Sequence, residues 1–123
     1  MLQFGLYKRT VVVLLFCSCL VSLSQQAQAI DAATLPEFRD DETFKTYLFG
    51  VGQGWLWANA RLGNKNQPKL FCVPPSLSLN FANYLSFLEA KINSSRAQGK
   101  LNEKMPVEVF LLAALEESFP CSQ

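Results

Sequence analysis

Apolar side chains recur along much of the chain at the spacing of amphipathic helices. In the segment 41–62 they lie three and four residues apart, which predicts a first long helix with one apolar face. That face consists of Phe44, Tyr47, Leu48, Val51, Trp55, Ala58 and Leu62. Acidic residues at the start of the segment favour a helix N-terminus, and Gly63 is expected to end the helix.

Two later segments show the same periodicity. The segment 79–93 predicts a second helix, with Ser78 as its N-cap. A third helix is expected from Pro106, because proline is favoured in the first turn of a helix. This third helix is apolar on more than one side, so we expect it to be the most buried element. Its expected buried face holds Val107, Phe110, Leu111, Ala114 and Leu115.

The connecting segments are typical of loops. Polar residues and prolines dominate 64–75, and polar residues fill the connection 94–100. Thr34 and Glu37 have the spacing of a capping box, so this stretch forms either a short helical turn or an extended arm. No stretch alternates as a strand does. The sequence therefore predicts an all-α fold, a small bundle of three main helices with short turns.

Three glycines lie within the first predicted helix. Gly50, Gly52 and Gly54 each cost a helix about 0.8–1 kcal/mol relative to alanine, so a structural reason is expected. Gly50, Gly54 and Ala58 form a strip of small residues along which another helix or a partner backbone can approach closely. The alternative is a kink or a break of the helix near Gly52. A dinucleotide-binding loop is excluded, because the G-x-G-x-x-G spacing fails at Trp55 and no βαβ unit surrounds it.

Residues 1–29 have the three parts of a secretory signal peptide. Lys8 and Arg9 give a positive start, and an apolar run follows over 11–23. Ala27-Gln28-Ala29 then matches a cleavage site. We therefore expect that residues 1–29 are removed during export.

Two alternatives to cleavage arise from the same segment. A membrane anchor needs about 20 apolar residues, and this apolar run is shorter. Lipid attachment would use Cys17 or Cys19, but the residues before these cysteines fit such a site poorly. Cleavage is the favoured interpretation, and it leaves a mature domain of residues 30–123 that starts with Ile30 and has no membrane span.

The cysteine count changes once the signal peptide is removed. Of the 4 cysteines, only Cys72 and Cys121 lie in the mature domain. Two cysteines in an exported chain are expected to form a disulfide, although free thiols are the alternative. The bridge would close a loop of about 50 residues and contribute roughly 4 kcal/mol, which matters because small domains have marginal cores.

Composition excludes several functions. The chain has 123 residues, of which 50% are hydrophobic, 11 are basic and 10 are acidic, and it contains no histidine. Its net charge of +1 gives no footprint for nucleic acid. Without histidine, Ser-His-Asp catalysis, Cys-His catalysis and histidine-bound metals are excluded. Ser76 and Ser78 also lack the G-x-S-x-G setting of a nucleophile. We expect a protein that is not an enzyme and that uses no cofactor or metal.

One surface feature predicts a partner-binding site. Trp57 and Arg61 lie on the face of the first predicted helix that points away from its apolar stripe. Both residue types are enriched at the dominant positions of protein interfaces. The expected contact residues are Trp57, Arg61 and Gln53 on the helix, with Asn64, Lys65 and Lys69 in the loop beside them. The alternative is that an N-terminal arm covers Trp57 through Leu35 and Phe38.

Three short elements of the mature domain carry a family resemblance. They are Tyr47-Leu48-Phe49-Gly50-Val51, then Phe71-Cys72-Val73-Pro74-Pro75 ahead of Tyr84-Leu85, and finally Ala113-Ala114-Leu115-Glu116-Glu117-Ser118-Phe119-Pro120-Cys121. Together with the signal peptide, they resemble the Tai-like immunity proteins of type VI secretion amidase effectors. The F-C-x-P element and the closing A-L-x-x-x-F-P-C element are the most specific parts.

The resemblance implies a helical periplasmic protein without catalytic activity, which binds a peptidoglycan amidase toxin and blocks its active site. Family members often carry another cysteine near the start of the first helix, where this chain has Phe44-Lys45-Thr46-Tyr47. A second bridge is therefore not expected, and inhibitory residues are not carried over. A small helical periplasmic stress chaperone is the alternative function, and a homodimer is left open.

Overall fold

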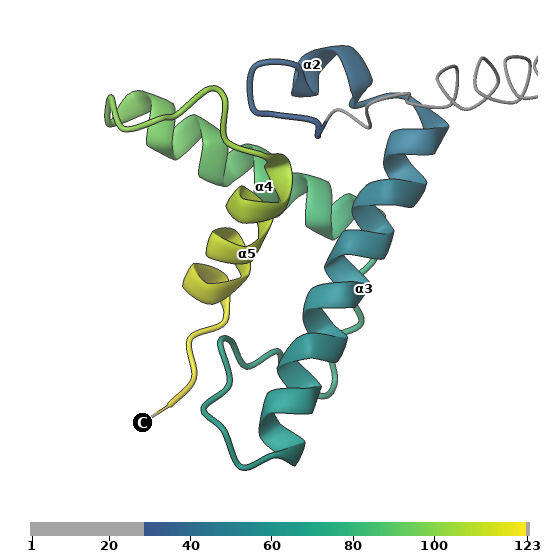
Figure 1. The fold of residues 1–123 in the computed structure, drawn as a ribbon, viewed down its shortest axis with the longest axis vertical. Helices are drawn as coiled ribbons and strands as arrows, with labels where there is room; N and C mark the ends of the chain where they lie inside the picture. The colour runs from purple at the N-terminus through teal and green to yellow at the C-terminus, as the bar shows by residue number, and fades with distance from the viewer. Residues whose placement is uncertain (1–28, 123) are drawn as a thin grey trace, which may run out of the picture.

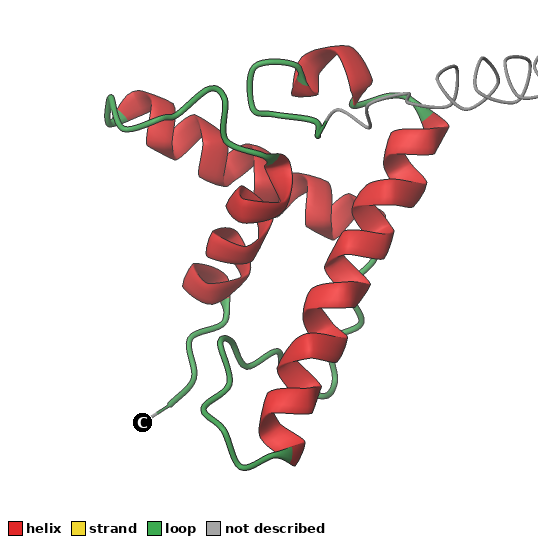
Figure 2. Cartoon of the chain, in the orientation of Figure 1, coloured by secondary structure: helices red, strands yellow, loops and turns green. Residues whose placement is uncertain are grey.

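The computed structural model describes residues 29–122, and four helices joined by loops occur in that part of the chain (Figure 1, Figure 2). They are α2 (Leu35–Phe38), α3 (Glu42–Asn64), α4 (Phe81–Ala97) and α5 (Val107–Ser118). The described residues contain no strand, only an isolated bridge between Asp31 and Pro106. The predicted all-α fold of three main helices is confirmed. Apart from Ala29, the predicted signal peptide lies outside the described residues.

The core lies where α3, α4 and α5 meet (Figure 1). Each helix contributes the apolar stripe predicted for it, and the loop after α3 adds a further aromatic ring. The largest fully buried side chains are Tyr84, Phe44, Phe71, Leu48, Leu88, Leu111, Leu115 and Val107. Five of the 12 residues of α5 are buried, compared with four of 23 in α3, so α5 has the larger buried share, as expected. Val109 of α5 and Ala58 of α3 nevertheless face solvent, contrary to the broad stripes predicted.

Helix α3 begins and ends through local capping. The Asp41 carboxylate accepts hydrogen bonds from the backbone N–H groups of Thr43 and Phe44, at 2.8 and 3.0 Å. The prediction that Gly63 ends the helix is wrong, because α3 continues to Asn64. Gly63 instead makes room for a side chain of the following loop, since an added Cβ would lie 2.6 Å from Cε of Lys69.

Helix α4 starts and ends later than predicted. Its N-cap is Asn80 rather than Ser78, because Asn80 and Asn83 form a reciprocal capping box through their side chains and backbone N–H groups. The helix then continues to Ala97, through residues that were expected to form a polar connection. Gly99, with a φ of 65°, reverses the chain two residues later.

The N-terminal arm folds across the ends of α4 and α5 (Figure 1). The short turn α2 forms, but the predicted capping box does not, because Thr34 makes no side-chain cap. Thr34 instead donates its backbone N–H to the Asp31 carboxylate at 3.0 Å. Three backbone bonds tie the arm to the start of α5 and the chain before it. Val107 N–H donates to the Ile30 carbonyl at 2.9 Å, and the N–H groups of Ala32 and Ala33 donate to the carbonyls of Met105 and Glu103 at 3.2 and 3.1 Å.

None of the helices in residues 29–122 is both long enough and apolar enough to span a bilayer.

Candidate partner-binding face

Helix α3 runs without a break through its three glycines, and only one of them makes a close contact inside the chain. A Cβ added at Gly52 would lie 2.4 Å from the Tyr84 ring, so this position allows α4 to approach α3 closely. Added Cβ atoms at Gly50 and Gly54 would meet nothing within 4 Å. The helix is therefore not broken near Gly52, and no other helix of the described residues packs along the strip at Gly50 and Gly54. Close approach of a partner along this strip stays a prediction.

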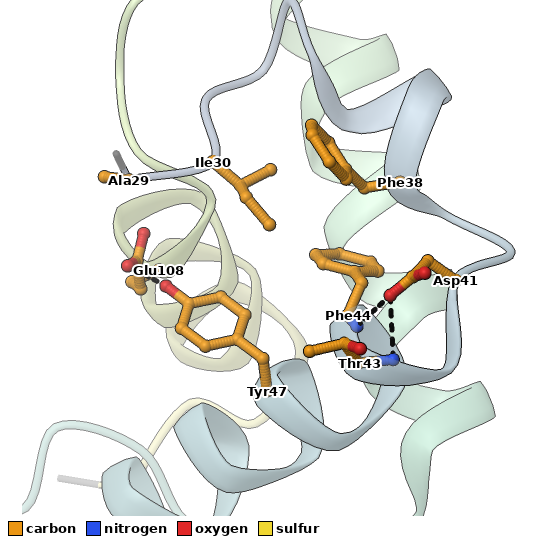
Figure 3. A pocket seen from close by; sticks show the side chains of 8 residues that line it. All are labelled: Ala29, Ile30, Phe38, Asp41, Thr43, Phe44, Tyr47 and Glu108. Atoms are coloured by element: carbon orange, nitrogen blue, oxygen red, sulfur yellow. Dashed lines mark hydrogen bonds between the residues drawn. The ribbon is translucent and has the colours of Figure 1, made fainter. Parts of the chain in front are cut away.

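The strip lies on the solvent face of α3, together with Trp57. Trp57 is 75% exposed and Arg61 is exposed beside it. The alternative in which the N-terminal arm covers Trp57 is wrong, because Leu35 is buried in the core and Phe38 lies near the first turn of α3 (Figure 3). A large apolar ring thus remains in solvent, supported by a continuous helix.

Gln53, one of the predicted contact residues, is only partly exposed on this face and also contacts α4. It is half-buried, and its side-chain amide donates a hydrogen bond to the Tyr84 hydroxyl at 3.1 Å. Burial raises the pKa of the Tyr84 phenol, and the hydrogen bond from Gln53 acts in the opposite direction. The structure therefore gives Gln53 an internal role in joining α3 to α4.

The C-terminal end of α3 and the loop that follows form a basic edge, which consists of Arg61, Lys65 and Lys69. All three side chains are exposed, and none of them forms an ion pair within residues 29–122. The sequence contains no acidic residue between Glu42 and Glu89, and Glu116 of α5 lines a hollow together with Lys69 without forming an ion pair with it. Asn64 is exposed at the same end.

Two connections hold this loop in place. The first is Asn59, a buried side chain whose amide donates to the Phe71 carbonyl at 2.6 Å and whose oxygen accepts from Leu70 N–H at 2.8 Å. Satisfying a buried amide in this way makes the loop position specific. Sequence reasoning missed Asn59, although a lone amide near the apolar stripe of a helix was a detectable signal.

The second connection is the predicted disulfide between Cys72 and Cys121, which is confirmed with a Cα–Cα distance of 4.9 Å. Beside it, Cys72 N–H donates to the Phe119 carbonyl at 2.7 Å. The bridge links the loop after α3 to the chain after α5. Trp57 and the basic edge therefore belong to a rigid surface rather than to a free loop.

A separate pocket of about 620 Å³ lies at the other end of α3 (Figure 3). Its lining consists of Ala29, Ile30, Phe38, Asp41, Thr43, Phe44, Tyr47 and Glu108. The Tyr47 hydroxyl donates a hydrogen bond to the Glu108 carboxylate, and burial together with this bond raises the pKa of Tyr47 well above its usual value. No sequence pattern signals this pocket, because Tyr47 belongs to the apolar stripe predicted for the first helix and Glu108 is a single acidic residue in the first turn of α5.

The described residues contain no group of three histidine, cysteine or acidic side chains that could hold a metal ion. Comparison of the chain with protein-family models, with curated proteins and with solved structures finds no match in any of the three. The geometry of the exposed α3 face and the sequence motifs are therefore the basis for a functional proposal.

Proposed function

We propose that this chain is an exported immunity protein that binds a peptidoglycan amidase of type VI secretion and blocks its active site. The export pattern and the two cysteine motifs support this proposal through their resemblance to Tai-like immunity proteins. The disulfide supports it further, because it joins the F-C-x-P element to the closing F-P-C element. The observation that carries it is the exposed Trp57 on a rigid, uncovered helix face.

In this proposal, the indole ring of Trp57 supplies most of the binding free energy. An aromatic ring of this kind buries roughly 150–250 Å², so covering the exposed part of Trp57 would gain about 4 kcal/mol at most. Gly50, Gly54 and Ala58 leave the helix backbone open beside the ring, which allows the rim of a cleft to come close. Inhibition would then be steric, with Trp57 as the anchor and no chemistry on the immunity side.

The basic edge adds electrostatic selectivity. Arg61 follows the anchor by one helical turn, and Arg61, Lys65 and Lys69 are all exposed at this end of α3, so a partner with an acidic rim would be steered toward this end of the helix. Exposed charges at an interface rim act mainly on the association rate, and salt should therefore slow binding.

We expect the gene neighbourhood to encode an exported peptidoglycan amidase, and the test measures binding of that amidase to the chain that begins at Ile30. Trp57→Ala should weaken binding by about 30-fold, because loss of a central anchor costs about 2 kcal/mol or more. Arg61→Ala should weaken binding by a smaller factor. Isothermal titration gives the dissociation constants, and release of peptide from peptidoglycan gives the inhibition.

Val109→Ala is the matched control, since Val109 is an exposed apolar residue on α5. It should leave the affinity unchanged, and all variants should keep the melting temperature of the parent. An unchanged dissociation constant for Trp57→Ala would contradict the assignment of the binding face. Failure of the parent domain to bind the amidase would contradict the immunity function itself.

A further inference from the structure

One carboxylate oxygen of Glu108 lacks a partner in the described part of the chain. Oε1 accepts a hydrogen bond from the Tyr47 hydroxyl, whereas Oε2 is buried and forms no hydrogen bond. Burial of a carboxylate oxygen without a partner is costly, so a donor or a cation at this position would be stabilising. Glu108 lies in the first turn of α5 and lines the pocket of Figure 3.

The chain entering this pocket is the segment where cleavage of the signal peptide is expected. Ala29 and Ile30 line the same pocket as Glu108 (Figure 3). The Ile30 carbonyl accepts a hydrogen bond from Val107 N–H at 2.9 Å, which fixes Ile30 beside the first turn of α5. The peptide bond between Ala29 and Ile30 therefore lies close to the residue after Val107, which is Glu108.

We propose that this pocket receives the α-ammonium group that signal cleavage creates at Ile30, with Glu108 as its ion-pair partner. Hydrolysis consumes one water molecule and breaks the C–N bond between Ala29 and Ile30. Ala29 leaves with the signal peptide as a new carboxylate, and Ile30 keeps the nitrogen, which is protonated at neutral pH. Processing thereby supplies a cation to a site that the unprocessed chain leaves incomplete.

The charges around Ile30 favour a cation. Apart from Glu108, the charged groups that line the pocket and the hollow next to it are Asp31, Glu37, Asp41 and Lys104. Asp31 lies 4.0 Å from the Lys104 ammonium, and Asp41 is occupied as the N-cap of α3. The N-terminus of α5 disfavours a nearby positive charge, but its first N–H is already bonded to the Ile30 carbonyl and Glu108 opposes its dipole.

The inference depends on the predicted cleavage site and not on the proposed amidase. It gives the N-terminal arm a state that only the exported, processed chain can reach. An ammonium paired with Glu108 would hold the arm against α5 more firmly than the neutral peptide group of the precursor does.

The test compares two forms of the chain, one beginning at Ile30 and one that retains Ala27-Gln28-Ala29. At pH 7 the form beginning at Ile30 should melt about 4 °C higher, because only it places an ammonium group beside Glu108. The pairing raises the pKa of the amine above its usual value of about 8, so this stabilisation is complete at lower pH and is lost as the pH rises. The difference should vanish at about pH 10.5.

Glu108→Gln in both forms should abolish the difference at pH 7, whereas Glu116→Gln at the exposed end of α5 should preserve it. Equal melting temperatures of the two parent forms would overturn the pairing, as would a difference that survives Glu108→Gln. N-terminal sequencing of the exported protein should give Ile30, and any other first residue would overturn the cleavage step. Neither readout involves the amidase.

Discussion

Side chains of single residues decide how closely α3 and α4 pack. Gly52 faces α4 and accommodates the Tyr84 ring, while Gly50 and Gly54 differ from it only in their angular position on the helix. Sequence spacing alone could not show which glycine makes the close contact, because all three are glycines within the same predicted helix. The choice depends on which side of α3 meets another helix, and that is a property of the packed core.

Gly52→Ala and Gly54→Ala should therefore have opposite effects on stability. Gly52→Ala should lower the free energy of unfolding by about 1–3 kcal/mol, because the Tyr84 ring has to move away from the new methyl group. Gly54→Ala should raise it by up to about 1 kcal/mol, since the position is open and alanine favours the helix. Urea unfolding measures both, and effects of the same sign would contradict this account.

At the scale of single elements, hydrogen bonds to carboxylates hold the N-terminal arm and the start of α3. Its turn and the start of α3 depend on two carboxylates, Asp31 and Asp41. The pKa of Asp31 is lowered chiefly by the hydrogen bond from Thr34 N–H, and that of Asp41 chiefly by the hydrogen bond from Phe44 N–H. The sequence predicted an acidic helix start, but the bonds of Asp31 depend on the arm being held against the chain before α5.

Acid should loosen this arm before it unfolds the core. Because both folded pKa values are lowered, the contribution of each carboxylate is complete above about pH 4 and is lost as the pH falls through the lowered pKa. The protection of the Thr34 and Phe44 amides against hydrogen exchange, measured relative to the exchange rate of an unstructured peptide at the same pH, should therefore fall between about pH 4 and pH 2, before the protection of Leu111 falls.

Asp41→Asn provides the matched control, because asparagine caps a helix as well as aspartate and does not titrate in this range. In this variant the protection of the Phe44 amide relative to an unstructured peptide should no longer depend on pH in this range. Binding of unfolded proteins by the whole domain near pH 3 would favour the chaperone alternative over immunity.

At the scale of the whole molecule, the disulfide restrains the loop that carries part of the basic edge. It ties the loop after α3, which carries Lys69, to the chain that leaves α5 (Figure 1). The hydrogen bonds of Asn59 to the backbone of the same loop restrain it as well, so the loop is held both by the bridge and by α3. The position of the basic edge relative to Trp57 thus depends on the whole fold.

Cys72→Ala with Cys121→Ala should lower the free energy of unfolding by roughly 4 kcal/mol, because the unfolded chain is no longer restricted by a loop of about 50 residues. Denaturant unfolding of the oxidised parent and the double variant gives this difference. A loss below about 1 kcal/mol would mean that the loop is held by Asn59 and the core without help from the bridge. Arg39→Ala is a control, since its pair with Glu89 at 3.2 Å is exposed and should contribute little.

The sequence by itself determined the fold class, the three main helices and the pairing of Cys72 with Cys121. These follow from local periodicity and from the presence of only two cysteines in residues 30–123. Only the tertiary structure decided that Gly52 is the close contact, that Trp57 stays uncovered, and that Glu108 shares a pocket with Ile30. Such relations join residues far apart in the chain, and their free energy depends on how the helices are packed rather than on the order of neighbouring residues.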